Sequence, residues 1–246
     1  MSDITVVIPA SPIKSHPDTS RLDECIATVR HHLPDSEIIL QLDGVHPDQE
    51  HFRKRYEEFK SKVLWKSLHE WTNVLPLVFE EHEHQSGMMY KSMEYINTPL
   101  ILYVESDCML TVDRDIDWDR CKEFIYNGKA NTIRFHFEEV IPKEHEGLII
   151  GNPEDWFIKT YQWSQRPHLS TRLYYEEILK HFPIDGKSFI EDEWHGVVMN
   201  DWHNSGQLGW YKHRLWIYYP PNGKLKRSYT LDGREGEKKV GEGIQK

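Results

Sequence analysis

The first half of the chain switches repeatedly between two patterns of hydrophobic and polar residues. Short runs of consecutive apolar residues, rich in β-branched side chains, are typical of strands buried on both faces. Between these runs, apolar residues recur at helical spacing, which predicts helices with one buried face. The runs predict strands at Ile4–Ile8, Glu37–Leu42, Leu75–Phe79 and Leu100–Val104.

The predicted helices lie between these strands, at Leu22–Leu33, Phe52–Val63 and Met89–Ile96. This alternation predicts an α/β fold with a mainly parallel, doubly wound sheet and helices on both faces. Parallel sheets bind ligands in the crevice outside the carboxyl ends of their strands. We therefore expect the residues that follow these strands to meet at one edge of the sheet.

The second half is less regular. Its pattern predicts strands at Thr132–Phe137 and Leu215–Tyr219, and helices at Thr171–Phe182 and from Trp194 to near Gly206. After Asn222 the chain is polar and rich in glycine and lysine. We expect residues 221–246 to form a basic, mobile C-terminal tail.

Composition narrows the class of protein. The chain has 246 residues, an ordinary size for one α/β domain, and its 9 Trp, 12 Tyr and 9 Phe can fill a core. No apolar run approaches the roughly 18 to 20 residues that cross a bilayer, so we expect no transmembrane segment. The start of the chain lacks the features of a signal peptide. Three cysteines fit a reducing compartment, and we expect a cytoplasmic protein.

The charge is unevenly distributed. The net charge of −10 makes a general nucleic-acid binder improbable. From Ser205 onward, however, nine Lys and Arg stand against four Asp and Glu. A basic end beside an acidic body suits an anionic ligand such as a phosphate, although a solvated tail explains the same pattern.

The segment Glu105-Ser106-Asp107 is the first candidate for chemistry, because it directly follows a buried strand. Two carboxylates spaced this way can turn into the crevice once the strand ends. Such oxygen ligands suit Mg²⁺ or Mn²⁺ held together with substrate phosphates. An ordinary acidic loop is the alternative.

The segment Glu191-Asp192-Glu193 opens a predicted helix. Helix capping by itself explains carboxylates there, but one of them can also act as a general base on a hydroxyl. Lys91 can neutralise a diphosphate, or it can be a surface lysine on its helix.

Histidines offer weaker signals. His82 and His84 lie among glutamates, which permits zinc binding, but a solvated polar loop explains the segment better. His213 becomes a third metal ligand only if its segment folds back to the crevice. The sequence has no Gly-x-Gly-x-x-Gly, no phosphate-loop lysine motif and no nucleophile elbow.

Taken in order, four segments resemble the family-2-type glycosyltransferases of the GT-A fold. ITVVIPAS is similar to that family's first strand, and EIILQLDG to its second strand with an acidic end. HQSGMMYKSMEYINTPLILYVESD resembles its helix and the strand leading to an Asp-x-Asp motif, and FIEDEWHG its later Glu-Asp motif. The match covers residues 4–110 well and residues 185–215 loosely.

The resemblance implies a nucleotide-diphospho-sugar donor, with a UDP-sugar favoured. Residues 1–110 would be the nucleotide-sugar-binding half, and residues 111–220 the acceptor-binding and catalytic half of the same domain. The nucleoside would be held by Pro9, Ala10, Ser11 and Asp43. The diphosphate would lie near Lys91 and Ser106.

The resemblance also implies how the reaction would run. Asp107, with Glu105, would hold a divalent metal, Mn²⁺ or Mg²⁺, on the diphosphate. His213 is the candidate for a third ligand from the residues alone. Asp192 would be the catalytic base, and Glu191 would support it or bind the acceptor. The result would be a metal-dependent, inverting transfer to an acceptor hydroxyl, and a non-processive one.

Several alternatives remain open. The acceptor can be a glycan, a lipid-linked sugar, a protein side chain or a modified nucleic-acid base. A sugar-nucleotide nucleotidyltransferase shares a related sheet, although residues 9–21 lack its glycine-rich, basic signature. A non-catalytic sugar- or nucleotide-binding module with a decayed transferase site is the third alternative. Ser11 and Glu105, which depart from the family pattern, favour that module.

Overall fold

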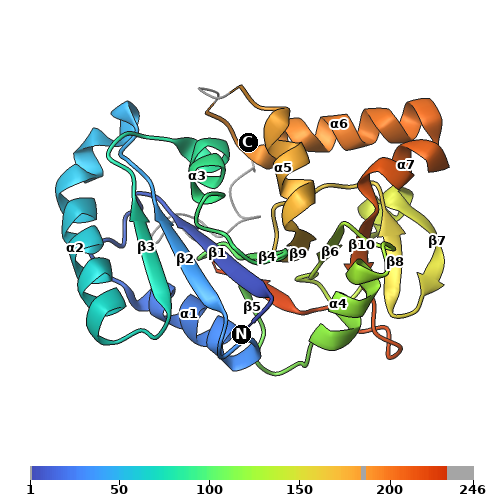
Figure 1. Cartoon of the computed structure of the whole chain (residues 1–246), viewed down its shortest axis with the longest axis horizontal. Helices are drawn as coiled ribbons and strands as arrows, with labels where there is room; N and C mark the ends of the chain where they lie inside the picture. The colour runs from blue at the N-terminus through green and yellow to red at the C-terminus, as the bar shows by residue number, and fades with distance from the viewer. Residues whose placement is uncertain (1, 184–186, 232–246) are drawn as a thin grey trace, which may run out of the picture.

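One mixed sheet organises the part of the chain that the computed structural model describes, residues 2–183 and 187–231 (Figure 1). Its nine strands lie in the order β3-β2-β1-β4-β9-β6-β10-β8-β7. Seven of them run in the same direction, whereas β8 and β9 run the opposite way. The fold class is therefore the predicted α/β class, with a mostly parallel sheet. The strands span Ile4–Ala10 (β1), Glu37–Leu42 (β2), Val74–Val78 (β3), Leu100–Tyr103 (β4), Thr132–Arg134 (β6), Ile149–Glu154 (β7), Phe157–Thr160 (β8), His168–Thr171 (β9) and Leu215–Tyr218 (β10).

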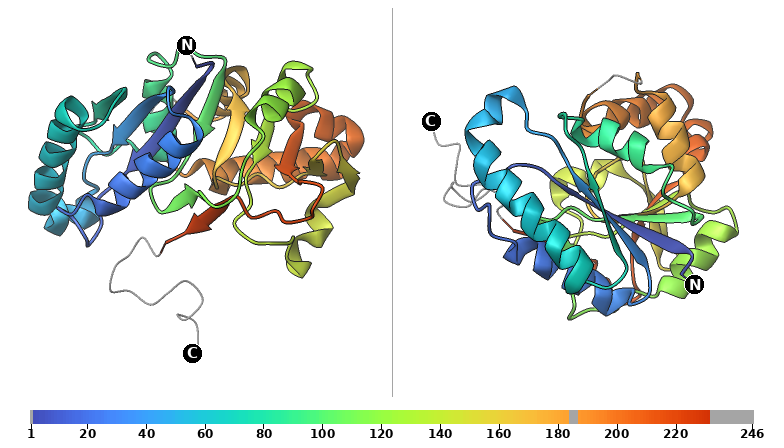
Figure 2. Two further views of the ribbon diagram at one scale, coloured as in Figure 1. Left: turned by 90° about the horizontal axis from the view of Figure 1, so that it is seen from below. Right: turned by 60° about the vertical axis from the view of Figure 1, so that its left-hand side comes forward.

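Helices cover both faces of this sheet, as predicted. Successive side chains of β1 point to opposite faces of the sheet. Val6 and Ile8 belong to the larger apolar core on one face, and Val7 belongs to a second core on the other face. Residues of three helices complete the larger core: α1 (Ser20–His32), α2 (Arg53–His69) and α4 (Trp118–Tyr126). The second core is completed by α3 (His84–Ser92), α5 (Arg172–Lys180) and α6 (Ile190–Ser205). The two further views in Figure 2 show the two helical layers.

The third helix differs from the prediction. It was expected at Met89–Ile96, but α3 begins earlier, at His84, and ends at Ser92. The Asp43 carboxylate accepts the backbone N–H groups of Glu83 and His84, and so supplies acceptors to free donors at the helix start. A partner distant in sequence therefore decides where this helix begins.

The second half contains elements that the pattern did not predict. The predicted helix at Thr171–Phe182 forms as α5, but β9 precedes it and inserts antiparallel between β4 and β6. The short strand β9 carries no distinctive alternation, because neighbours cover it on all sides. A short helix, α7 (Gln207–His213), follows α6 and leads into β10.

The start of the predicted tail forms part of the fold. A strand at Ser228–Thr230 (β11) pairs antiparallel with one at Cys108–Leu110 (β5). Just before it, the buried Arg227 guanidinium donates to three backbone carbonyls, those of Asp115, Lys224 and Lys226. The rest of the predicted tail, residues 232–246, lies outside the described residues.

Among the helices of the described residues, none combines the length and the hydropathy needed to cross a bilayer. The three cysteines, Cys25, Cys108 and Cys121, are all buried and unbridged.

Candidate active site

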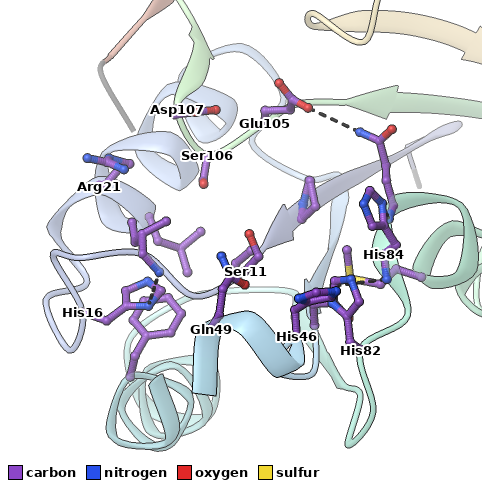
Figure 3. A pocket seen from close by; sticks show the side chains of 18 of the residues that line it. Ser11, His16, Arg21, His46, Gln49, His82, His84, Glu105, Ser106 and Asp107 are labelled. Carbon is purple, nitrogen blue, oxygen red and sulfur yellow. Dashed lines mark hydrogen bonds and ion pairs between the residues drawn. The ribbon is translucent and has the colours of Figure 1, made fainter. Parts of the chain in front are cut away.

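A cavity of about 780 Å³ opens at the carboxyl edge of the sheet, where β1, β2 and β4 end. It brings together residues that the sequence separates widely (Figure 3). The predicted site residues among its lining are Pro9, Ala10, Ser11, Asp43, Glu105, Ser106 and Asp107. Parallel strands carry their ends to one edge, which explains why these segments meet.

Asp43 ties two walls of the cavity together. It is 1% exposed, and its Oδ1 accepts the backbone N–H of Gly44 at 2.8 Å and that of Glu83 at 2.7 Å. Its Oδ2 accepts the N–H of His84 at 3.2 Å and lies 3.0 Å from Nδ1 of His82. Gly44 permits the close approach, since a Cβ there would lie 2.1 Å from a backbone carbon of Glu81.

Three histidines, His46, His82 and His84, form one wall of the cavity. Residues 80–84 were expected to form a solvated polar loop, and this expectation is wrong for His82 and His84. The rings of His46 and His82 lie 4.9 Å apart, and those of His82 and His84 5.3 Å apart. Asp43 draws this loop against the sheet. In the described ranges no group of three or more His, Cys, Asp or Glu side chains is arranged to hold a metal ion.

The opposite wall contains His16, which the sequence did not single out. Its ring is 3% exposed and stacks on Phe59 with centroids 3.8 Å apart. Burial lowers its pKa to about 3, and the positive charges of Arg21 and Arg55 act in the same direction. The ring is therefore neutral at neutral pH. Nothing in the local pattern reveals it, because His16 lies in a turn and its ring partner Phe59 belongs to α2, more than forty residues away.

Glu105 lies at the inner end of the cavity. Withdrawal from water raises the pKa of its carboxyl to about 8, and the negative charges of Asp107 and Glu191 add to the rise. Its Oε1 lies 3.4 Å from Nε2 of Gln85, a residue that also donates to the Tyr103 hydroxyl and accepts the N–H of Ile190. Gln85 thus joins the ends of β4, α3 and α6.

Two buried or partly buried carboxylates that repel each other favour a bound cation. Glu105 and Asp107 supply the oxygen ligands that Mg²⁺ and Mn²⁺ prefer, and substrate phosphates commonly complete such sites. Among the described residues no third His, Cys, Asp or Glu side chain joins these two carboxylates, so a divalent metal bound here would need a diphosphate to complete its ligands.

His213 does not join them, contrary to the expectation. It lies in α7, where its Nε2 is 2.9 Å from Asp201 Oδ2 and its Nδ1 is 2.9 Å from the Tyr174 hydroxyl. The helix pair α6–α7 carries this histidine into a separate buried network. It is not part of the cavity lining.

Lys91 is not part of the lining either. Its Nζ lies 2.6 Å from Oε1 of Glu83, on the outer side of α3. The earlier start of α3 explains this, because it places Lys91 in the last turn of the helix. The structure therefore does not bring Lys91 to the cavity.

Glu191 and Asp192 occupy the first turn of α6, next to Phe189, which lines the cavity. Oε2 of Glu191 accepts the backbone N–H of Gln165 at 2.9 Å, so this carboxylate is held in place. Asp192 is exposed, and its charge acts on the cavity residue His84. The two neighbours thus face different surroundings.

No family model matches the sequence, and no curated protein sequence matches it. Solved structures do. S. aureus TarS 1-349 in complex with UDP-GlcNAc aligns with a TM-score of 0.56 and 13% identity, over 95% of this chain and 59% of that one. GalNAc-T7 with UDP, GalNAc and Mn²⁺ aligns with a TM-score of 0.56 and 12% identity, over 96% of this chain and 45% of that one.

This chain therefore spans between two fifths and three fifths of the length of these two structures. Identity this low establishes the fold alone. The sheet order, the helices on both faces and these alignments show that the chain has the GT-A fold of nucleotide-sugar glycosyltransferases.

Proposed function

We propose that this protein is a metal-dependent glycosyltransferase that moves a sugar from a nucleotide-diphospho-sugar to an acceptor hydroxyl. One observation carries the proposal: Glu105 and Asp107 follow β4 at the carboxyl edge of a GT-A sheet, beside a cavity of about 780 Å³. That volume lies within the range that small-molecule sites occupy. TarS and GalNAc-T7, whose structures contain UDP-GlcNAc and UDP respectively, favour a UDP-sugar as donor.

In this proposal different parts of the cavity bind different parts of the donor: residues 9–11 bind the nucleoside, and residues 105–107 bind the diphosphate and its metal. Pro9, Ala10 and Ser11 contact the nucleoside. Asp43 holds the wall that contains His82 and His84 in place through its hydrogen bonds to that loop. Ser106 lies between the two acidic residues, where it can donate its hydroxyl to the diphosphate. Glu105 and Asp107 hold the divalent metal.

The metal, when bound, stabilises the negative charge that develops on the leaving diphosphate. Glu105 must be deprotonated to serve as a ligand, and a nearby cation lowers its raised pKa. Asp192 removes the proton from the acceptor hydroxyl as this oxygen attacks the anomeric carbon. Glu191, held by the Gln165 N–H, supports the acceptor side. Attack from the face opposite the diphosphate gives inversion.

The first test is thermal stability with UDP, GDP, CDP or dTDP, each with and without Mn²⁺. A ligand at 100 times its Kd stabilises the folded state by about 2.7 kcal/mol. We expect a Mn²⁺-dependent rise in Tm with UDP, and loss of that rise in Asp107→Asn. Asp113→Asn removes the same charge from an exposed position outside the lining and should keep it.

A UDP-dependent shift that needs no metal would contradict the metal assignment. Binding of a nucleoside triphosphate in place of every diphosphate would favour a nucleotidyltransferase. Metal-dependent UDP binding without any breakdown of a UDP-sugar would identify a binding module with a decayed site.

A further inference from the structure

Two arginines belong to the same edge of the sheet as Glu105, on the side away from the nucleoside wall, and the charge of one of them, Arg166, acts on Glu105. Arg134 is the last residue of β6, and Arg166 lies two residues before β9 begins. Figure 1 shows β9 between β4 and β6. Because β9 runs antiparallel to both, the end of β6 and the start of β9, to which the arginines belong, lie next to the end of β4. Register supports this: Arg134 is opposite His168, and the N–H of Phe135 donates to the carbonyl of Pro167.

Neither arginine forms an ion pair within the described ranges. Arg134 is 5% exposed and its Nη1 donates only to the amide oxygen of Gln162, at 3.1 Å. The guanidinium of Arg166 lies over the ring of Phe137, with its central carbon 3.7 Å from the ring centroid. Burial lowers the pKa of both arginines, and their mutual repulsion lowers that of Arg134 further, to about 9. The charges of Glu138, Glu191 and Glu105 act on Arg166 and that of Glu191 on Arg134, but none of these carboxylates pairs with either guanidinium. Two guanidinium groups that repel each other without an ion pair favour an added anion.

Unpartnered donors collect at the same place. The Nε atom of Arg134 is buried without a hydrogen-bond partner in the described chain. So is Nδ1 of His195, and the charges of Arg134 and Glu191 act on this ring. Folded proteins rarely leave buried polar atoms unpaired, so this cluster indicates a ligand that accepts hydrogen bonds.

Glu138 adds the complementary group. Its Oε2 is also buried without a partner, and its charge acts on Arg166. A carboxylate oxygen needs a donor, which a hydroxyl of the same ligand supplies. A ligand that carries both an anionic group and hydroxyls would supply acceptors to the arginines and a donor to Glu138.

We propose that Arg134 and Arg166 form an anion subsite for the acceptor, so that the acceptor bears a phosphate or carboxylate group near the hydroxyl that receives the sugar. This inference rests on the proposed function, because it takes Glu105 to mark the reacting end of the donor. Arg166 is half-buried and reachable from solvent, whereas Arg134 is 5% exposed. The subsite is distinct from the lining of the donor cavity.

The test follows the arginine side-chain Nε–Hε resonances by NMR while inorganic phosphate is added at constant ionic strength. The donor site is filled beforehand with UDP and diamagnetic Mg²⁺, which leaves nearby resonances sharp. Loss of single resonances in Arg134→Lys and Arg166→Gln assigns the two signals. Arg172→Gln is the matched control, since this arginine follows the same strand β9 at the opposite edge of the sheet.

We expect saturable shifts of the Arg134 and Arg166 signals that persist with UDP bound. Arg166→Gln should weaken phosphate binding about tenfold or more, and Arg172→Gln should leave it unchanged. Acetate as a second probe separates the sources: tighter binding of phosphate indicates a phosphate-bearing acceptor, and tighter binding of acetate a carboxylate.

Shifts that saturation with UDP abolishes would assign the anion to the donor site and overturn the subsite. The absence of saturable shifts, or equal weakening in Arg172→Gln, would overturn it as well. If UDP and Mg²⁺ themselves leave the spectrum unchanged while phosphate still shifts both signals, the anion site stands and the proposed function fails. The two hypotheses therefore fail separately.

Discussion

Single carboxylates around the cavity differ because their surroundings differ. Both carboxylate oxygens of Asp43 accept backbone N–H groups, and one also lies beside His82, so this residue holds the two walls of the cavity in position. Glu105 has few donors, and burial and neighbouring charges raise its pKa to about 8. Glu191 is held by one backbone N–H, and Asp192 is exposed. Residue type alone does not separate these roles.

Asp43→Asn should lower both stability and nucleotide binding. The asparagine keeps one acceptor oxygen, but its NH₂ group faces backbone donors that lose their partner, at a cost of about 2 kcal/mol. Urea unfolding measures the change. The control Asp35→Asn, in an exposed turn, should change stability by less than about 0.5 kcal/mol. Equal effects of the two substitutions would contradict the organising role.

Asp192→Asn should slow the breakdown of a UDP-sugar much more than Glu191→Gln. A general base contributes about 10²- to 10⁴-fold to rate. The glutamine at position 191 still accepts the N–H of Gln165 through its amide oxygen. The measurement is the rate of UDP release by the two variants, and the Tm of each variant shows whether it is folded. A larger loss in Glu191→Gln would transfer the role of base to Glu191.

At the scale of elements, close helix contact decides the second half of the fold. The α6–α7 pair meets at Gly209, where a Cβ would lie 1.9 Å from the carbonyl oxygen of Asp201. This contact also carries His213 to Asp201 and away from the cavity. In contrast, Gly196 in the middle of α6 has open space around its Cα.

Gly209→Ala should therefore destabilise the protein by about 3 kcal/mol, because backbone atoms must move to admit the methyl group. Gly196→Ala is the matched control within the same helix pair. It should stabilise the protein by about 0.5 to 1 kcal/mol, since alanine restricts the unfolded chain and favours the helix. Urea midpoints report both. A neutral Gly209→Ala would disprove the tight α6–α7 contact.

For the whole molecule, buried neutral histidines govern how stability depends on pH. The pKa values of His16 and His136 are lowered to about 3 and that of His168 to about 4, in each case chiefly by burial. Below pH 6.5 the unfolded chain binds protons at these positions and the folded protein does not. Stability is therefore lost as the pH falls from about 6.5 toward 4.

Glu105 acts in the opposite direction. Its raised pKa means that the metal-free folded state holds a proton which the unfolded state releases above about pH 4.5. Each group contributes up to about 1.4 kcal/mol per pH unit, so three histidines outweigh one glutamate. We expect urea midpoints to fall steeply from pH 6 to pH 5. A flat or rising midpoint over this range would contradict the burial of these histidines as neutral rings.

Most strands and helices of the first half of the fold could be predicted from the sequence. Leu75–Phe79 was predicted and Val74–Val78 is found, because a run of apolar residues in this αβ alternation has few other ways to be buried. The acidic strand end at Glu105-Ser106-Asp107 was recognisable for the same reason. The strand β9 was not, since its four residues pair only with strands distant in sequence.

The sequence by itself determined the α/β class, the parallel strands β1 to β4 and the residues at their carboxyl ends, because hydrophobic periodicity and strand ends are local properties. Tertiary structure decided the rest. Asp43 sets the start of α3 and draws His82 and His84 into the cavity, while the α6–α7 contact removes His213 from it. It also brought Arg134 and Arg166 to the same edge as Glu105, through a strand order that no local pattern encodes. Long-range hydrogen bonds and close packing select one arrangement among many that the same local pattern allows.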